Sequence, residues 1–304
     1  MRHPSLQPPP PSGLSRRRFL ALGGSAAAGA VLLVACGGGD STSNSADTTA
    51  PTTAAAGTGS TTTAAPSDLT TGTPSDTVFR ATDFAGVGAC MLLPDLTRGP
   101  YPTIEQIERR DITEGKAGLP LRVGIQVVDE SCTPIPNAVV EIWHCDIDGD
   151  YSAYADGYRS DDAGAGTTYF RGNQVANADG IVEFHTVYPG WYRGRAVHIH
   201  AMVHIDDRTP LTTQFLFADE LNEEILATGP YASFGLPDTT NAEDSTTGGS
   251  AEADGLLMTV SDDAAIDGRR ALIVVGLDPA GSSQGASGGG GPAGGPPTRP
   301  DRNA

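Results

Sequence analysis

The sequence predicts an all-β protein, a mostly antiparallel β-sandwich with long loops and disordered termini. Short apolar runs of strand length recur between residues 119 and 276, and Gly, Pro, Asn and Asp separate them. Only residues 219–227 have a helical pattern, and no internal repeat is present. Residues 1–77 and 281–304 differ in composition from the middle of the 304-residue chain, which therefore predicts one domain with a single core.

The clearest predicted strand is residues 119–129, where apolar and polar residues alternate. A Pro-Ile-Pro-Asn turn at 134–137 precedes a second strand at 138–143, so these two strands are predicted to form a β-hairpin. Long loops at 146–180 and 228–254 are expected to carry function. The later predicted strands are 181–186, 196–205, 213–217, 255–260 and 271–276.

The N-terminal residues resemble an export signal. Three arginines, Arg16 to Arg18, precede an apolar run that ends at Ala35 and is too short and too rich in Gly and Ala for a comfortable membrane span. Residues 1–35 are therefore predicted to be a twin-arginine, lipoprotein-type signal. The protein is then exported, and lipid at Cys36 is its only expected contact with a membrane.

Composition also sets the expected domain boundaries. Residues 36–77 and 281–304 consist largely of Gly, Ser, Thr, Ala and Pro, which cannot bury enough apolar surface to fold. They are expected to be a disordered tether and a disordered tail around a domain at 78–280. The chain has 37 acidic and 19 basic residues, a net charge of −18, so binding to nucleic acid is not expected.

Residues 188–200 carry the side chains around which a functional site is expected. A Pro-Gly turn is followed by one phenol, Tyr192, and two imidazoles, His198 and His200. The two histidines are two positions apart, so on a strand both rings leave the same face of the sheet. This arrangement is typical of a metal site.

A calcium loop is one interpretation of the preceding segment. Asp146, Asp148 and Asp150 form a ladder of carboxylates with the spacing of such loops. The glycine falls at the fourth position instead of the sixth, however, and the twelfth position is Gly157 instead of a glutamate. These two differences argue against calcium.

Two further interpretations concern iron. His144, Asp146 and His198, followed by Arg208, have the residue types of the two-histidine, one-carboxylate triad of ferrous, 2-oxoacid-dependent oxygenases. The alternative takes Tyr151 as a second phenol ligand. The triad leaves three candidate ligands unexplained: Tyr151, Tyr192 and His200.

An ordered set of motifs resembles one family. The motifs are Pro134-Ile135-Pro136-x-Ala138-x-Val140-Glu141-Ile142-Trp143, Gly149-x-Tyr151, Pro189-Gly190-x-Tyr192, Arg195-x-x-His198-x-His200 and Thr213-Gln214, with Gly99-Pro100-Tyr101 and Arg110-Asp111-Ile112 upstream. Together they resemble the intradiol ring-cleavage dioxygenases, in particular their exported branch, over roughly residues 90–276. Gly-x-Tyr or His-x-His alone is a weak signal, whereas the ordered set is specific.

The resemblance implies a non-haem Fe(III) ion held by Tyr151, Tyr192, His198 and His200, with a solvent hydroxide completing the shell. It implies that Tyr151 and His198 are equatorial, that Tyr192 and His200 are axial, and that Tyr192 is displaced when a catechol binds. Two anionic phenolates suit a hard, highly charged ferric ion better than imidazoles alone, and the charge of the ion lowers the phenol pKa.

The activity that the resemblance implies is cleavage of an aromatic diol by O₂ to a muconate-type dicarboxylate. Arg195 matches the family arginine that steadies negative charge on the substrate, and Gln214 matches a glutamine of the same pocket. The expected partners are a small aromatic diol and O₂, with the identity of the diol and a homodimer left open. The alternative function is an exported β-sandwich that binds a ligand without catalysis.

Other residues compete for the ligand positions. Tyr154 and Tyr158 lie in the same loop as Tyr151, although the Gly-x-Tyr motif favours Tyr151. On the strand, His204 has the same parity as His198 and His200, so the three histidines allow a zinc site. A zinc site of this kind would give the phenols no role. The histidines that compete for the imidazole positions are His144, His185 and His204.

Export permits disulfides, and three cysteines remain beside Cys36. In the predicted hairpin Cys132 and Cys145 lie at opposite ends of a strand, so a bridge between them is not expected. Pairing of Cys90 with either of them stays open, as do three unpaired thiols.

Overall fold

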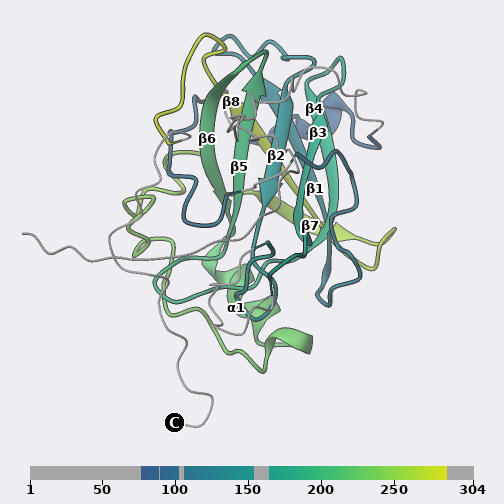
Figure 1. Ribbon diagram of the computed structural model, residues 1–304, viewed down its shortest axis with the longest axis vertical. Helices are drawn as coiled ribbons and strands as arrows, with labels where there is room; N and C mark the ends of the chain where they lie inside the picture. The colour runs from purple at the N-terminus through teal and green to yellow at the C-terminus, as the bar shows by residue number, and fades with distance from the viewer. Residues whose placement is uncertain (1–76, 89, 103–105, 154–163, 286–304) are drawn as a thin grey trace, which may run out of the picture. The chain divides into compact units, whose positions relative to one another are not determined.

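The computed structural model of the chain describes residues 77–88, 90–102, 106–153 and 164–285 (Figure 1). Its strands are β1 (Pro120–Val128), β2 (Val139–Trp143), β3 (Arg171–Val175), β4 (Ile181–Val187), β5 (His198–Ile205), β6 (Arg208–Leu216), β7 (Thr259–Asp263) and β8 (Gly268–Gly276). Its helical segments are η1 (Ala81–Phe84), α1 (Asp219–Leu226) and η2 (Gly229–Tyr231).

The strands form two four-stranded sheets. Sheet I has the order β4-β1-β8-β7, and sheet II has the order β3-β2-β5-β6. All pairs of neighbouring strands within the two sheets are antiparallel except β1 with β8. The predicted all-β sandwich is therefore confirmed.

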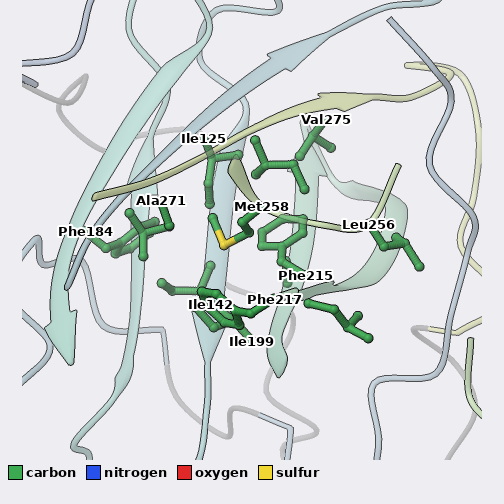
Figure 2. Close-up of a cluster of buried hydrophobic side chains, with 14 of the residues drawn as sticks. Ile125, Ile142, Phe184, Ile199, Phe215, Phe217, Leu256, Met258, Ala271 and Val275 are labelled. Carbon is green, nitrogen blue, oxygen red and sulfur yellow. The ribbon is translucent and has the colours of Figure 1, made fainter. Parts of the chain in front are cut away.

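The core lies between the sheets and follows the period-2 alternation of the strands. Ile125 and Phe184 of sheet I belong to the same buried cluster as Ile142, Ile199 and Phe215 of sheet II, and Figure 2 shows these side chains together. Each fully buried large apolar side chain contributes roughly 1.5–3 kcal/mol. Because alternate residues of sheet II fill this core, the residues between them point to its outer face.

The predicted hairpin is wrong. β1 lies in sheet I and β2 in sheet II, and an isolated bridge between Val128 and Pro134 is the pairing at the start of the connection. The alternation identifies which face of each strand is apolar but not which strand lies beside it. The inner faces of β1 and β2 both belong to the core between the sheets.

Further differences concern strand positions, and β6 begins five residues earlier than its predicted strand at 213–217. β3 lies inside the segment predicted to be the loop 146–180. Its inner positions are Gly172 and Gln174, so it lacks the apolar alternation by which a strand is predicted. β7 begins four residues later than its predicted strand. The predicted helix is confirmed as α1, which ends one residue earlier than expected.

The folded part also extends beyond the predicted boundary at residue 280. Ser283 is buried, and its hydroxyl is bonded to the hydroxyl of Thr212 at 2.7 Å. Ser283, which the sequence assigns to the tail, is therefore packed against β6.

A segment before β1 crosses the outer face of sheet II. Leu96 N donates to Thr212 O on β6 at 2.7 Å, and Arg109 N donates to Asn173 O on β3 at 3.1 Å. β6 and β3 are the two edges of sheet II, so the chain passes from one edge to the other. We call residues 96–102 and 106–109 the strap.

A disulfide joins Cys90 to Cys132, with 5.5 Å between their Cα atoms. This is one of the pairings that the sequence left open, and Cys145 is a buried free thiol. In the part of the chain that the structure describes, no helix has the length and apolar character needed to cross a membrane.

Candidate metal centre

The candidate site begins with one row of side chains on the outer face of sheet II. Trp143 on β2 is paired with Arg171 on β3 and with His200 on β5, and His200 is paired with Gln214 on β6. Directly opposed residues of an antiparallel pair share a face of the sheet, so these four side chains lie side by side. His198, two residues before His200, belongs to the same face.

Two loops bring the phenols to this face. Tyr151 follows β2, and Tyr192 follows β4. A Cβ at Gly149 would lie 2.5 Å from the carbonyl oxygen of Trp191, and a Cβ at Gly190 would lie 2.1 Å from that of Asp146. The two loops therefore pack backbone against backbone through two glycines, and this contact explains why a glycine lies two residues before each tyrosine.

The four predicted ligand atoms converge. Tyr151 Oη lies 3.4 Å from His198 Nε2 and 3.1 Å from His200 Nε2, and Tyr192 Oη lies 3.3 Å from His198 Nε2. The two Nε2 atoms are 3.1 Å apart. All four side chains are buried, with at most 7% of any residue exposed.

The donor set fits a metal ion. His198 Nδ1 donates to Ala196 O at 2.7 Å, which leaves a lone pair on Nε2 aimed at the other three donors. In the metal-free protein a phenol O–H can donate to an imidazole Nε2, but once the phenols lose their protons the four lone pairs repel one another unless a cation lies between them. A metal about 2.0–2.2 Å from each donor separates neighbouring donors by roughly 3 Å, close to the separations seen here.

Burial sets the protonation of these groups in the metal-free protein. It lowers the pKa of His198 to about 3 and that of His200 well below its ordinary value, with the nearby positive charge of Arg195 adding to both effects. Burial also raises the pKa of both phenols, Tyr151 and Tyr192. The imidazoles are therefore neutral, as ligands must be, and the phenols lose their protons when a cation binds.

Stacking holds the ring of His200. Its imidazole lies parallel to the indole of Trp143, with 4.8 Å between ring centroids and 1° between planes. On the strap, a Cβ at Gly99 would lie 3.0 Å from His200 Cε1, so a larger residue there would crowd the ring. His200 Nδ1 has no hydrogen-bond partner among the described residues, so ring packing and the contacts of Nε2 set the orientation of the ring.

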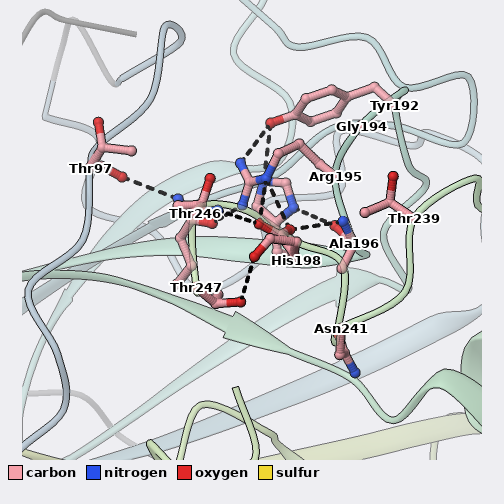
Figure 3. Close-up of polar contacts among 12 residues, drawn as sticks. Thr97, Tyr192, Gly194, Arg195, Ala196, His198, Thr239, Asn241, Thr246 and Thr247 are labelled. Atoms are coloured by element: carbon pink, nitrogen blue, oxygen red, sulfur yellow. Dashed lines mark hydrogen bonds and ion pairs between the residues drawn. The ribbon is translucent and has the colours of Figure 1, made fainter. Parts of the chain in front are cut away.

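Arg195 lies beside the phenol of Tyr192. Its Nη1 donates to Tyr192 Oη at 3.3 Å (Figure 3). Its Nη2 donates to Gln214 Oε1. Gln214 Nε2 donates in turn to Thr97 O at 3.1 Å. Asp244 accepts from Arg195 Nε at 3.0 Å. The structure thus brings both predicted catalytic partners, Arg195 and Gln214, next to the four donors.

Sequence reasoning missed three residues of this neighbourhood. Trp143 and Arg171 lie in the same row as His200. Their place beside it depends on the register between strands, which the sequence alone does not give. Asp244 lies in the predicted functional loop 228–254, where no motif distinguishes it from the other acidic residues.

The competing histidines have other partners. His144 is bonded to Cys145 O and Thr186 Oγ1, at 2.8 and 2.7 Å. His204 is bonded to Thr209 Oγ1 at 2.9 Å, and its other nitrogen lies 3.4 Å from Glu141. His185 pairs with Glu183, while Tyr154 and Tyr158 lie outside the described residues.

Side chains that the calcium, zinc and ferrous-triad interpretations need as metal ligands make other contacts instead. Asp146 Oδ1 accepts from the backbone N–H of Asp148 and of Asp150, each at 3.0 Å, and its Oδ2 binds Lys116 at 2.7 Å. Its carboxylate therefore builds the loop that carries Tyr151. In the described ranges of the chain, no group of three or more His, Cys, Asp or Glu side chains could hold a metal, so a site needs the phenols.

The fold and the donor set define a class: a β-sandwich with a buried site of two phenols and two imidazoles that suits non-haem iron. A family model described as "Dioxygenase" matches residues 99–233, which include all four donors. The structure is similar to an intradiol ring-cleavage dioxygenase from Tetranychus urticae, with 28% identity, a TM-score of 0.59, and coverage of 64% of this chain and 98% of that one. Over this part of its length the chain is similar to the intradiol ring-cleavage dioxygenases.

Two curated relatives match over shorter stretches. The chain is 31% identical over 110 residues to chlorocatechol 1,2-dioxygenase from Rhodococcus opacus, which is 30% of this chain and 40% of that protein. It is 30% identical over 128 residues to catechol 1,2-dioxygenase 1 from Acinetobacter lwoffii, which is 36% of this chain and 39% of that protein. The chain thus spans about 40% of the length of these relatives.

Proposed function

We propose that this chain cleaves a catechol-type aromatic diol with O₂, using a ferric ion held by Tyr151, Tyr192, His198 and His200. The observation that carries the proposal is the convergence of these four donor atoms within 3.1–3.4 Å of their neighbours in a buried site. The match of residues 99–233 to the dioxygenase family model supports the same activity.

The proposed reaction balances without an added reductant. The bond between the two hydroxyl-bearing ring carbons breaks, each of these carbons gains one oxygen atom of O₂, and the product is a muconate-type dicarboxylate. The two carbons are oxidised as O₂ is reduced. When bound, the ferric ion supplies the electron-withdrawing centre that makes a catecholate reactive toward O₂.

The protein's own residues supply proton acceptance, charge and orientation. A deprotonated Tyr192 Oη is a base for a substrate hydroxyl, and Arg195 Nη1, 3.3 Å away, stabilises that phenolate. Gln214 fixes one edge of the guanidinium, so the positive charge stays beside the site where substrate charge develops. Burial of the four donors excludes bulk water.

The test is oxygen uptake by iron-loaded protein with catechol, hydroxyquinol and protocatechuate side by side. We expect a red to burgundy protein, because phenolate-to-iron charge transfer absorbs visible light, and stoichiometric O₂ consumption with at least one diol. Tyr192→Phe removes one phenolate and is expected to weaken or shift the absorption band. An iron-replete, coloured protein that consumes no O₂ with any of the diols would favour the non-catalytic binding module.

We also propose that the protein works outside the cytoplasm, anchored by lipid at Cys36. The disulfide between Cys90 and Cys132 supports an oxidising compartment. Membrane fractionation of cells that express the full chain tests this. The wild type is expected in the membrane fraction and Cys36→Ala outside it, whereas equal distribution of the two would reject the anchor.

A further inference from the structure

A loop that carries Asp238 and Asp244 binds the turn between Tyr192 and β5, the strand of His198 and His200. Asp238 accepts from Gly194 N at 2.9 Å and lies 3.5 Å from Arg193. Asp244 contacts the next two residues, Arg195 and Ala196. The loop therefore holds the turn at two successive points, one exposed and one buried.

Asp244 is the buried point, and its side chain is 0% exposed. Its two oxygens accept from Arg195 Nε at 3.0 and 3.2 Å, from Ala196 N at 2.9 Å and from Thr246 N at 2.8 Å. Burial opposes ionisation of this carboxyl, but Arg195 and the two backbone N–H groups hold its pKa below its ordinary value. A charged carboxylate therefore faces Arg195 at neutral pH.

The loop that carries Asp244 is itself anchored. Asn241 Nδ2 donates to Phe217 O at 2.7 Å, which ties the loop to the end of sheet II. A Cβ at Gly249 would lie 2.5 Å from Ala242 O, so the loop closes tightly on itself. Asp244 is thus a fixed acceptor and can fix what it binds.

We propose that Asp244 is a positioning residue for the reaction, an inference that rests on the proposed function. The guanidinium of Arg195 makes contacts on three sides: Nε to Asp244, Nη1 to Tyr192 and Nη2 to Gln214. A planar fork held on three sides has one orientation. Asp244 sets that orientation and balances the positive charge beside the metal donors, although it does not touch the substrate or the metal.

A double-mutant cycle separates this role from a purely structural ion pair. Asp244→Asn is expected to lower kcat by about 10- to 100-fold with a smaller change in KM, as for other residues that orient groups at a metal site. In an Arg195→Gln background the same change is expected to lower kcat by less than about threefold, because the group that Asp244 orients is already gone. Equal losses in both backgrounds would overturn the proposal.

Asp238→Asn is the matched control. It removes the same charge from the same loop and contacts the same turn, but it does not contact Arg195. We expect kcat within about twofold of the wild type. If Asp238→Asn lowers kcat as much as Asp244→Asn does, the effect belongs to the loop as a whole and the proposal fails.

A second variant covers the case in which Asp244→Asn does not fold. Asp244→Glu keeps the charge but moves the carboxylate by one methylene, so it is expected to fold and to lower kcat at least about tenfold through misplacement of Arg195. Wild-type kcat in a folded Asp244→Glu would overturn the proposal.

A spectroscopic readout separates failure of this inference from failure of the proposed function. Asp244→Asn leaves the charge of Arg195 beside Tyr192 unbalanced, so the phenolate-to-iron band of the loaded protein is expected to shift relative to Asp238→Asn. A wild type that is coloured but consumes no O₂ with any diol rejects the proposed function, while the band still tests Asp244. An unshifted band rejects the charge-balancing role of Asp244.

Discussion

At the scale of single residues, glycines decide whether the two phenols meet. Gly149 has φ +84° and faces the carbonyl of Trp191, and Gly190 faces the carbonyl of Asp146. In the sequence these glycines read as ordinary turn residues. The structure shows a second reason why glycine is needed at these two positions. Any side chain there would push apart the loops that carry Tyr151 and Tyr192.

Gly149→Ala is therefore expected to impair metal binding and not only stability. Its Cβ would lie 2.5 Å from a backbone oxygen, so one loop must move, and ferric-ion affinity is expected to fall by about 10- to 100-fold. The control is Gly86→Ala, which has nearly the same φ (+87°) and no atom within 4 Å of the added Cβ. Both variants carry the backbone strain of about 1–2 kcal/mol, measurable by urea unfolding. Gly149→Ala protein that binds ferric iron as tightly as Gly86→Ala would contradict this account.

The residue types of the site were accessible from sequence, because phenols and imidazoles in a fixed order are a chemical signature. The roles of Trp143 and Asp244 were not. Trp143 acts through a ring stack across neighbouring strands, and Asp244 acts through a contact between residues 49 positions apart. Neither contact leaves a pattern in the local sequence, so both can be identified only from the folded structure.

At the scale of elements, strand order is what sequence reasoning could not supply. The alternation in β1 and β2 located both strands and their apolar faces, yet the two belong to different sheets. β3 was not predicted as a strand because its inner positions are glycine and glutamine. Pairing partners depend on contacts between distant segments, whereas periodicity reports only what each strand buries.

Glu183 on β4 binds the segment that precedes η1 and makes the fold sensitive to acid. Burial opposes its ionisation, but bonds from His185, Thr77 and Val78 outweigh that effect and lower its pKa from 4.5 to about 2. Because the folded pKa lies below the unfolded one, the stabilisation is fully present above about pH 4.5 and is lost as the pH falls toward 2.

Glu183→Gln is therefore expected to flatten the acid side of the stability profile. At pH 6 the variant is expected to be about 2 kcal/mol less stable than the wild type, and the gap is expected to narrow below about pH 4.5 and to close toward pH 2. Urea unfolding at a series of pH values measures both effects. Glu130→Gln, in an exposed turn, removes the same charge and serves as the control. A gap that stays constant with pH would show that ionisation of Glu183 does not contribute.

At the scale of the whole molecule, the described fold depends on the segment that precedes β1. Leu93 pairs with Gly276 of sheet I, and the strap then crosses sheet II and places Gly99 against His200. The disulfide from Cys90 to Cys132 holds the start of this segment to the connection between β1 and β2. The same segment thus belongs both to the packing of the sandwich and to the candidate metal centre.

Loss of the disulfide is accordingly expected to lower stability and to loosen the site. The bridge spans 42 residues, and closing a loop of that length stabilises the folded state by about 2–4 kcal/mol. A Cys90→Ser, Cys132→Ser double variant is expected to lose this much in urea unfolding and to release bound ferric iron faster to a chelator, because the strap loses an anchor. In the iron-free protein, reductant should have the same effect on unfolding of the wild type and none on the double variant, which separates the bridge from the buried thiol of Cys145. Iron-free wild-type protein whose unfolding is unchanged by reductant would mean that hydrogen bonds alone hold the segment against the sandwich.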